Sequence, residues 1–201
     1  MDKDVKLILA SNSPRRKELL KQITLEFLVV PSNYDEEFKR GMTPYGYVLS
    51  CAKGKALDVL NYLNYHSEYN KESHPFIIIA ADTIVVTKDS KILLKPQNEK
   101  EAFNMLKELS NNWHRVSTAV CVKFNEKTLL KYKSSYVRFN EFEECDIMNY
   151  IKSGSPFDKA GGYGVQDEWI KARVARIDGS IDNIMGLPLK QTKKMLKEVL
   201  E

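Results

Sequence analysis

The chain has 201 residues, a net charge of +4 and a pI of about 8.8, with 43% hydrophobic and 29% charged residues. This composition is typical of a globular protein with a sizeable core, and the basic excess is too weak to indicate nucleic-acid binding. No apolar stretch approaches a membrane span, and the N-terminus lacks a signal-peptide pattern. The three cysteines are scattered and form no Cys-x-x-Cys pair. They argue against structural zinc and a disulfide framework and favour reduced thiols in the cytoplasm.

The first predicted elements are a strand and a helix joined by a tight polar loop. Residues 7–10 form a short apolar run that ends at small polar residues, as a buried strand does. Ser13 is a good N-cap and Pro14 suits the first helical position. The sequence therefore predicts a helix that begins at Pro14 and continues to Leu20.

The first turn of this helix carries three positive charges, on Arg15, Arg16 and Lys17. The N-terminal end of a helix is itself positive, so each exposed charge costs about a few tenths of a kcal/mol there. A docked anion removes the conflict, because backbone N–H groups, the Ser11 and Ser13 hydroxyls and an arginine would all face it. The pattern favours this anion site over the alternative, a basic and solvated helix start.

Strands and helices are interspersed along the rest of the chain, which predicts an α/β fold with a mixed sheet. We find no internal repeat and no clear linker, so we expect a single domain over residues 1–201. Residues 61–74 are polar and biased in composition, which predicts a surface excursion with His66 and His74 solvated. Further strands are predicted at 26–30, 76–86, 92–94, 113–124, 128–139 and 170–177, and further helices at 44–63, 98–109, 143–151 and 188–200.

Asp82 is the sharpest outlier among the candidate functional residues. It interrupts residues 76–86, whose β-branched density predicts a central strand buried on both faces. A carboxylate in such a strand costs free energy unless it is paired, hydrogen-bonded or bound to a metal. A structural salt bridge to a lysine is one explanation, but buried carboxylates often mark functional sites, and we favour that role.

A group of acids lies in the polar loop that follows the second predicted strand. Asp35, Glu36 and Glu37 by themselves are typical of a solvated turn. Together with Asp82 they could hold a hard divalent cation through oxygen ligands. Magnesium bound by one or two carboxylates plus substrate phosphates is the usual arrangement at nucleotide sites.

The remaining candidates are less specific. Lys55 lies within a predicted helix, and Lys95 stands before a proline where a solvating charge is unusual. The glycine-rich loop at 157–167 allows the backbone to approach a ligand closely, but it is not a dinucleotide fingerprint. Gly54 weakens its helix, and His114 has no catalytic partner nearby in sequence and is expected to be structural. The residues alone indicate a phosphorylated ligand with a metal, and they identify no reaction.

Together, these motifs resemble the Maf family of nucleoside triphosphate pyrophosphatases over nearly the whole chain. Each motif alone is weak, but their joint order and spacing are highly specific. The matching segments are LASNSPRRKELL at 9–20, DE at 35–36, AKGKA at 52–56, ADTIV at 81–85, KP at 95–96, HRVST at 114–118, DKAGGYGVQ at 158–166 and GLPL at 186–189.

The resemblance implies a fold similar to that of the inosine triphosphatase superfamily, with an elongated mixed sheet flanked by helices and two lobes around a cleft. It implies hydrolysis of a nucleoside triphosphate between the α and β phosphates, with Mg²⁺ or Mn²⁺, to a monophosphate and pyrophosphate. Arg15, Thr83 and Gln166 look like the branch that acts on dTTP and UTP. The resemblance alone suggests a homodimer, and no nucleic-acid or membrane partner is expected.

The resemblance also implies residue roles. Asp82 matches the family's catalytic proton acceptor, and Glu36 and Asp82 would hold the metal; how Asp82 divides these two roles stays open. Lys55 and Lys95 would neutralise charge on the leaving pyrophosphate, and the Gln166 amide offers the donor and acceptor that a uracil or thymine edge needs. The full set of implied substrate-binding residues is Ser11, Ser13, Arg15, Lys55, Thr83, Lys95 and Gln166.

Two positions depart from the family pattern, and both bear on base preference more than on reaction type. Leu94 stands before the Lys-Pro pair, and residues 167–169 (Asp-Glu-Trp) replace a small, glycine-containing segment. A competing function is a non-catalytic nucleotide-sensing regulator of cell division that uses the same pocket. The intact Asp82, Lys55 and Lys95 favour the enzyme, because a sensor needs no buried general base.

Overall fold

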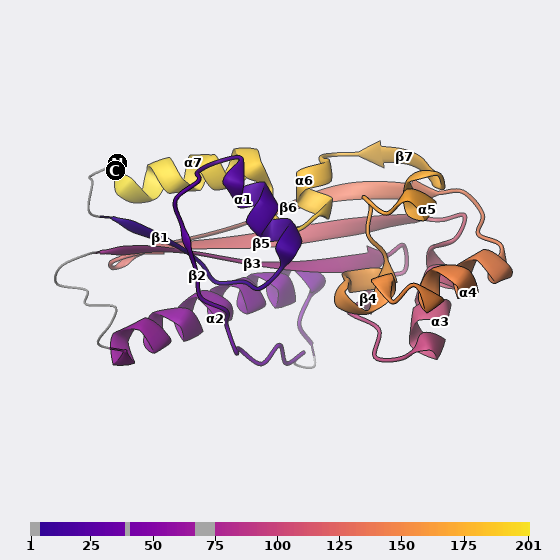
Figure 1. Cartoon of the computed structure of the whole chain (residues 1–201), viewed down its shortest axis with the longest axis horizontal. Helices are drawn as coiled ribbons and strands as arrows, with labels where there is room; N and C mark the ends of the chain where they lie inside the picture. Colours follow the sequence, from indigo (N-terminus) through magenta and orange to yellow (C-terminus); the bar gives the residue numbers. More distant parts are fainter. Residues whose placement is uncertain (1–4, 39–40, 67–74) are drawn as a thin grey trace. The chain divides into compact units, whose positions relative to one another are not determined.

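The structure, a computed structural model, describes residues 5–38, 41–66 and 75–201. It confirms the α/β class: a mixed seven-stranded sheet has the order β2-β1-β3-β5-β6-β7, with β4 paired to β3, and helices flank it (Figure 1). The strands are β1 Lys6–Leu9, β2 Leu28–Val29, β3 Phe76–Thr87, β4 Ile92–Leu93, β5 Trp113–Phe124, β6 Lys127–Phe139 and β7 Val174–Asp178. The helices are α1 Pro14–Lys21, α2 Pro44–Tyr65, α3 Glu99–Leu109, α4 Glu144–Lys152, α5 Glu168–Lys171, α6 Ile181–Ile184 and α7 Leu189–Leu200, with 3-10 turns η1 Ser155–Asp158 and η2 Ala160–Gly162.

The chain forms two compact units. The first unit comprises residues 1–82, 118–133 and 186–201, and the second comprises residues 83–117 and 134–185. The long strands β3, β5 and β6 each contribute residues to both units. No helix in the described part of the chain is long and apolar enough to cross a membrane.

In the first unit, β1 lies between β2 and β3 and pairs in parallel with both. Helices α2 and α7 cover opposite sides of this part of the sheet (Figure 1). Because both faces of the strands are covered, their sequences are continuously apolar rather than alternating. Leu7, Ile8 and Leu9 of β1 and Ile77 and Ile78 of β3 are accordingly all buried.

The predicted helix starts are confirmed by their caps. The Ser13 hydroxyl accepts a hydrogen bond from the backbone N–H of Arg16, and the Thr43 hydroxyl accepts one from Gly46. The Asn98 side chain accepts from the N–H of Glu101 at 2.9 Å. Each cap satisfies a backbone donor that the first helical turn leaves without a partner.

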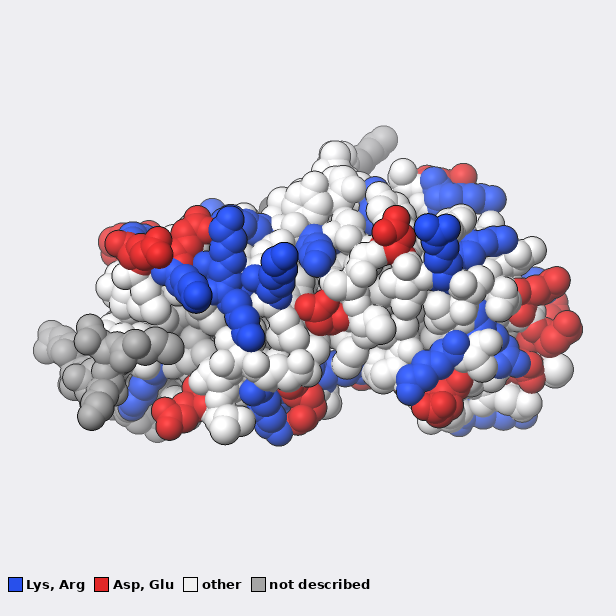
Figure 2. Space-filling model, turned by 90° about the horizontal axis from the view of Figure 1, so that it is seen from above, with Lys and Arg blue, Asp and Glu red and all other residues white. Residues whose placement is uncertain are grey.

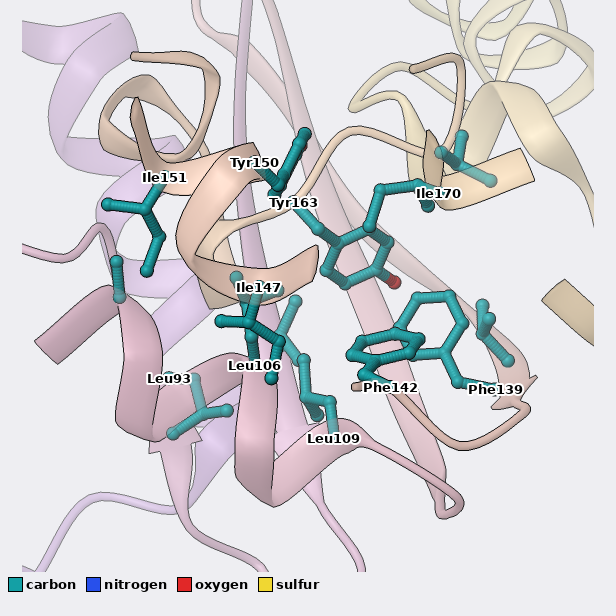
Figure 3. Packing of buried hydrophobic residues seen from close by; sticks show 14 of the residues in the cluster. Leu93, Leu106, Leu109, Phe139, Phe142, Ile147, Tyr150, Ile151, Tyr163 and Ile170 are labelled. Atoms are coloured by element: carbon teal, nitrogen blue, oxygen red, sulfur yellow. The ribbon is translucent and has the colours of Figure 1, made fainter. Parts of the chain in front are cut away.

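In the second unit, β4 returns antiparallel to the end of β3, and β7 pairs antiparallel with β6. An apolar cluster forms the core of this unit, with α3 packed against α4 and aromatic side chains beside them (Figure 3). The Phe139 ring lies 5.0 Å from the rings of both Phe142 and Tyr163, tilted against the first and edge-on to the second, and edge-on packing is an arrangement that aromatic pairs prefer.

Two sequence predictions about elements need correction. Residues 170–171 end the short helix α5, and the strand begins only at Val174. Helix α2, predicted to end at residue 63, continues to Tyr65 within the stretch predicted as a surface excursion. His66, predicted to be solvated, is exposed and stacks on Tyr62, whereas His74 lies outside the described residues.

His114 is structural, as predicted. It lies in β5 and is 2% exposed, and its Nε2 is 2.6 Å from the Tyr163 hydroxyl. Its ring also contacts Phe139. Burial lowers the pKa of His114 from its ordinary value of 6.5 to about 3, so the imidazole is neutral in the folded protein at neutral pH.

This burial predicts a pH-dependent stability. Between pH 6.5 and 3 the unfolded chain protonates His114 and the folded chain does not, so the free energy of unfolding falls as the pH decreases through this window. From pH 7.5 to 5 the contribution of His114 is about 2 kcal/mol. Urea denaturation at both pH values measures the loss in the free energy of unfolding between pH 7.5 and 5. In His114→Gln this loss should be smaller than in the wild type by about this amount. Equal losses in the wild type and the variant would contradict the prediction.

Candidate active site

The loop between β1 and α1 is held by its own serines. The Ser13 N–H donates to Ser11 Oγ at 3.2 Å, and Ser13 caps α1 through the Arg16 N–H. Ser11 is buried, and α1 has no acidic residue in its first turn. Seen from the α7 side, Lys and Arg side chains gather over α1 and α7 (Figure 2). The loop is therefore a helix N-terminus with basic surroundings, a setting suited to an anion.

Arg16 is tied back to this loop rather than extended into solvent. Its Nε donates to the Gly186 carbonyl at 2.9 Å, and its Nη1 donates to Ser11 Oγ at 3.3 Å. Burial lowers the pKa of Arg16, while the charges of Asp82 and Glu36 act in the opposite direction. The alternative of a basic and solvated helix start therefore does not apply to Arg16. Its guanidinium is held in place, within the electrostatic reach of both acids.

Lys55 connects the two acids that the sequence placed far apart. Its ammonium lies 2.6 Å from Glu36 Oε1 and 2.7 Å from Asp82 Oδ1. The side chains of Lys55 and Asp82 are only 13% and 6% exposed, whereas Glu36 is 35% exposed. Asp82 is thus a buried carboxylate with a cationic partner, which satisfies the requirement that its position in β3 imposes. The predicted candidates Glu36, Lys55 and Asp82 form one cluster.

Helix α2 also fixes the segment that carries Glu36. Asp58 Oδ2 accepts hydrogen bonds from the Ser32 hydroxyl and the Asn33 N–H, both at 2.8 Å. The Tyr34 N–H donates to Ser32 Oγ at 3.0 Å, and the Tyr47 hydroxyl donates to the Glu36 carbonyl at 3.1 Å. Side chains from a single helix therefore anchor the segment both ahead of Glu36 and at the Glu36 carbonyl itself.

Gly54 allows the ring of Tyr34, in the loop that carries Glu36, to approach α2 closely. A Cβ atom at position 54 would lie 2.3 Å from the ring of Tyr34, well inside van der Waals contact. The sequence identified Gly54 only as a weak point of the helix. The structure shows that the missing side chain gives room to the Tyr34 ring.

Two further α2 side chains face the acids but remain protonated. Burial raises the pKa of the Cys51 thiol to about 12, and the negative charge of Asp82 raises it further. Burial also raises the pKa of the Tyr47 phenol, with Cys51, Asp82 and Glu36 adding to the effect. A thiolate is the reactive form of cysteine, so the buried and protonated Cys51 is a packing residue.

The donor set for a divalent cation is limited to two carboxylates. Among the described residues, no group of three or more His, Cys, Asp or Glu side chains could hold a metal ion. Glu36 and Asp82 nonetheless converge on one point, the Lys55 ammonium. Two convergent carboxylates fit Mg²⁺, which is usually held by one or two such groups together with substrate phosphates and water.

Three other predicted site residues, Thr83, Lys95 and Gln166, belong to the second unit. Thr83 and Gln166 are half-buried, and Lys95 is exposed. The glycine-rich loop is hydrogen-bonded to the residue that follows β4. The Gly161 N–H donates to the Leu94 carbonyl at 3.0 Å. Gly161 has φ +70°, and a Cβ there would lie 2.8 Å from Val85, so a glycine is required.

Sequence reasoning missed three features of this site: the bond from Arg16 to Gly186, the Asp58 anchor and the Tyr34–Gly54 contact. Arg16 and Gly186 both lie in motifs that were singled out, but their pairing across 170 residues had no local signal. Asp58 is an ordinary polar residue in a helix. Only the spacing of Gly54, Lys55 and Asp58, which places them near one face of α2, could have indicated a common role.

The buried ion pair predicts a strong dependence of stability on Lys55. Lys55→Met leaves the Asp82 carboxylate without its cation and should lower the free energy of unfolding by about 3 kcal/mol. Adding Asp82→Asn to this variant should recover at least half of the loss, because the orphaned charge is removed. Urea denaturation measures both effects. The exposed neighbour Lys53→Met is the matched control, and a similar loss in that variant would refute the assignment.

The Tyr34 contact predicts a reversal of the usual helix preference. In an open helix, Gly→Ala stabilises by about 1 kcal/mol. Gly54→Ala should give less than this, or destabilise, because the Tyr34 ring must move. In a Tyr34→Ala background the same change should recover the full gain, which denaturation of the four variants measures as a coupling energy. Equal effects of Gly54→Ala in both backgrounds would show that the contact carries no energy.

The chain is similar to known proteins over nearly its whole length. Residues 6–199 match the family described as Maf-like protein. A protein from Caldicellulosiruptor bescii is 42% identical over 196 residues, covering 96% of this chain and 94% of its own length. Relatives from Aquifex aeolicus and Neisseria meningitidis are 40% and 39% identical over 195 and 193 residues, covering 97% and 96% of this chain and 96% and 93% of their own lengths. All three are named dTTP/UTP pyrophosphatase. The chain belongs to the Maf-like protein family.

Proposed function

We propose that this protein hydrolyses nucleoside triphosphates, with dTTP and UTP as preferred substrates, to the nucleoside monophosphate and pyrophosphate. The observation that carries the proposal is the contact of one buried ammonium, Lys55, with two carboxylates, Glu36 and Asp82. This cluster lies in the same unit as the basic start of α1. The names of the relatives support the same activity and the same pair of substrates.

The proposed reaction is attack of water on the α phosphorus. The bond from this phosphorus to the oxygen that bridges the α and β phosphates breaks, and pyrophosphate leaves with that oxygen and its electron pair. Asp82 accepts a proton from the attacking water, since a carboxylate placed within reach of that water can act as a general base. Lys55 holds the Asp82 carboxylate in place, and it offers positive charge to the developing pyrophosphate.

The polyphosphate would be held by groups of the first helix and by lysines. Ser11, Ser13 and the backbone N–H groups at the start of α1 supply donors, and Arg15 supplies a planar, bidentate cation. The anchored Arg16 adds a fixed positive charge beside Ser11. In the second unit, exposed Lys95 is proposed to neutralise charge on the leaving pyrophosphate.

A divalent cation, Mg²⁺ or Mn²⁺, is proposed to bind Glu36 and Asp82. When bound, it would neutralise phosphate charge and polarise the phosphoryl group under attack. The two carboxylates provide the oxygen ligands, and the substrate phosphates complete the set. Lys55 occupies the point between the carboxylates in this structure, so we expect its ammonium to shift toward the phosphates when the cation binds.

Base preference is proposed to rest on Thr83 and Gln166, with Arg15 as the third residue of the dTTP/UTP pattern. The Gln166 amide can donate and accept at once, as the edge of uracil or thymine requires. Among the described residues, no hydrogen bond of the Gln166 side chain is present, so the amide is available to a ligand.

The match of residues 6–199 to one family supports treating the two units as a single domain over residues 1–201. We further propose a cytoplasmic protein, which its three free cysteines support. The family resemblance suggests a homodimer, and light scattering on the purified protein would measure its mass.

The function is tested by product analysis. Purified protein with Mg²⁺ and UTP or dTTP should release monophosphate and pyrophosphate in equal amounts, and chelation of the metal should abolish release. Asp82→Asn should lower kcat by roughly a hundredfold to ten-thousandfold, the range expected for loss of a general base. Asp89→Asn, an exposed turn aspartate, should retain full activity.

Two outcomes would overturn this proposal. Near-normal turnover by Asp82→Asn would reject both the base and the metal-ligand role of that residue. Tight binding of dTTP or UTP by the wild type without any pyrophosphate release would indicate a nucleotide sensor instead of an enzyme.

A further inference from the structure

Gln166 lies in a four-residue turn that runs from Gly164 to Asp167. The Asp167 N–H donates to the Gly164 carbonyl at 2.9 Å, which closes the turn around Val165 and Gln166. Val165 is buried and Gln166 is half-buried. The direction of the Gln166 side chain therefore depends on how firmly the two ends of this turn are held.

The Tyr150 hydroxyl, from α4, joins the two ends. It accepts a hydrogen bond from the Gly164 N–H at 3.1 Å and donates to Asp167 Oδ2 at 2.6 Å. Ser155 Oγ donates to the same carboxylate oxygen at 2.6 Å. The hydrogen bonds form a closed ring that passes through Gly164, Tyr150 and Asp167 and encloses the turn.

The carboxylate of Asp167 takes part in this ring instead of capping the helix that follows it. Asp167 is the N-cap residue of α5, where an aspartate normally accepts from a backbone N–H of the first turn. It makes no such cap bond. A Cβ on Gly164 would lie 2.9 Å from both carboxylate oxygens, so the carboxylate and the turn are packed directly against each other.

Tyr150 is itself held by packing. Its ring stacks on Trp169 at 4.8 Å, and Trp169 contacts the Phe142 ring at 5.0 Å and the Arg173 guanidinium at 4.6 Å. Asp167 and Trp169 belong to the three-residue segment that departs from the family pattern. The structure places this departure under the Gln166 turn, where Asp167 bonds the hydroxyl of Tyr150 and Trp169 supports its ring.

We infer that Asp167 is a positioning residue for base selection, acting through the Tyr150 hydroxyl to hold the turn that presents Gln166. This inference rests on the proposed function, in which Gln166 reads the pyrimidine edge. A side chain that reads a base by hydrogen bonds discriminates only while its position is fixed, because a mobile amide can adapt to the wrong base.

The experiment compares kcat/KM for UTP and CTP, which differ only in the hydrogen-bonding groups of the base edge. Asp167→Ala and Tyr150→Phe should each lower the ratio of UTP to CTP about tenfold. Asp167→Asn keeps an acceptor oxygen for Tyr150 and Ser155 and should stay within about twofold of the wild type. The neighbouring exposed acid provides the control, and Glu168→Gln should leave the ratio unchanged.

A double-mutant cycle tests whether the effect passes through Gln166. In a Gln166→Ala background, Asp167→Ala should cause no further change in the ratio, because the residue that it positions is gone. Thermal denaturation of each variant accompanies the kinetics. Tyr150→Phe retains the ring that stacks on Trp169, so it carries the test even if Asp167→Ala does not fold.

Three results would overturn the inference while leaving the hydrolase assignment intact. These are a wild type that does not discriminate UTP from CTP, equal losses for both substrates in Asp167→Ala and Tyr150→Phe, and a ratio that still changes in the Gln166→Ala background. Absence of pyrophosphate release from every triphosphate would instead overturn the proposed function, and this inference with it.

Discussion

The structure of the site depends on the charge of one lysine. Lys55 lies on α2 and brings together Glu36, from a loop, and Asp82, from the middle of β3. A buried ion pair contributes little net stability, because the loss of hydration offsets most of the attraction. Its effect here is to fix the place of a carboxylate that β3 could not otherwise accommodate. In the proposed function, a cation takes the place of Lys55 beside the two carboxylates, and a polyphosphate takes the place of the carboxylates beside the Lys55 ammonium.

Helix α2 explains why Glu36 is available to that cluster. Its side chains Tyr47 and Asp58 bond to the segment that carries Glu36, and Gly54 admits the ring of Tyr34. Loops that carry functional residues are commonly positioned by a rigid element beneath them. In this protein a single helix supplies both the central cation and the anchors of the loop, so the position of Glu36 relative to Lys55 follows from one element.

In the second unit, the glycine-rich loop is supported by different means. Gly161 and Gly164 allow close backbone approach, and aromatic residues pack beneath the loop. The polar ring around Tyr150 is built from groups that are hydrogen-bonded to one another, which is the condition for a stable buried network. Residues 167–169 therefore support the loop. The segment that departs from the family pattern supplies Asp167, which bonds the Tyr150 hydroxyl, and Trp169, which stacks on the Tyr150 ring.

The sequence by itself determined the α/β class, most element positions, the capped start of α1 and the presence of a buried acid at Asp82. These follow from local rules, since periodicity, capping and the cost of burying charge act on neighbouring residues. It misplaced residues 170–171 because an apolar run of this length is compatible with either a strand or a short helix. Only the tertiary structure decided that Lys55 is the partner of Asp82, that Arg16 bonds Gly186, and that Asp167 faces Tyr150 instead of capping α5. Each of these pairings joins residues distant in sequence or overrides a local preference, so the chain has to be folded before the partner is defined.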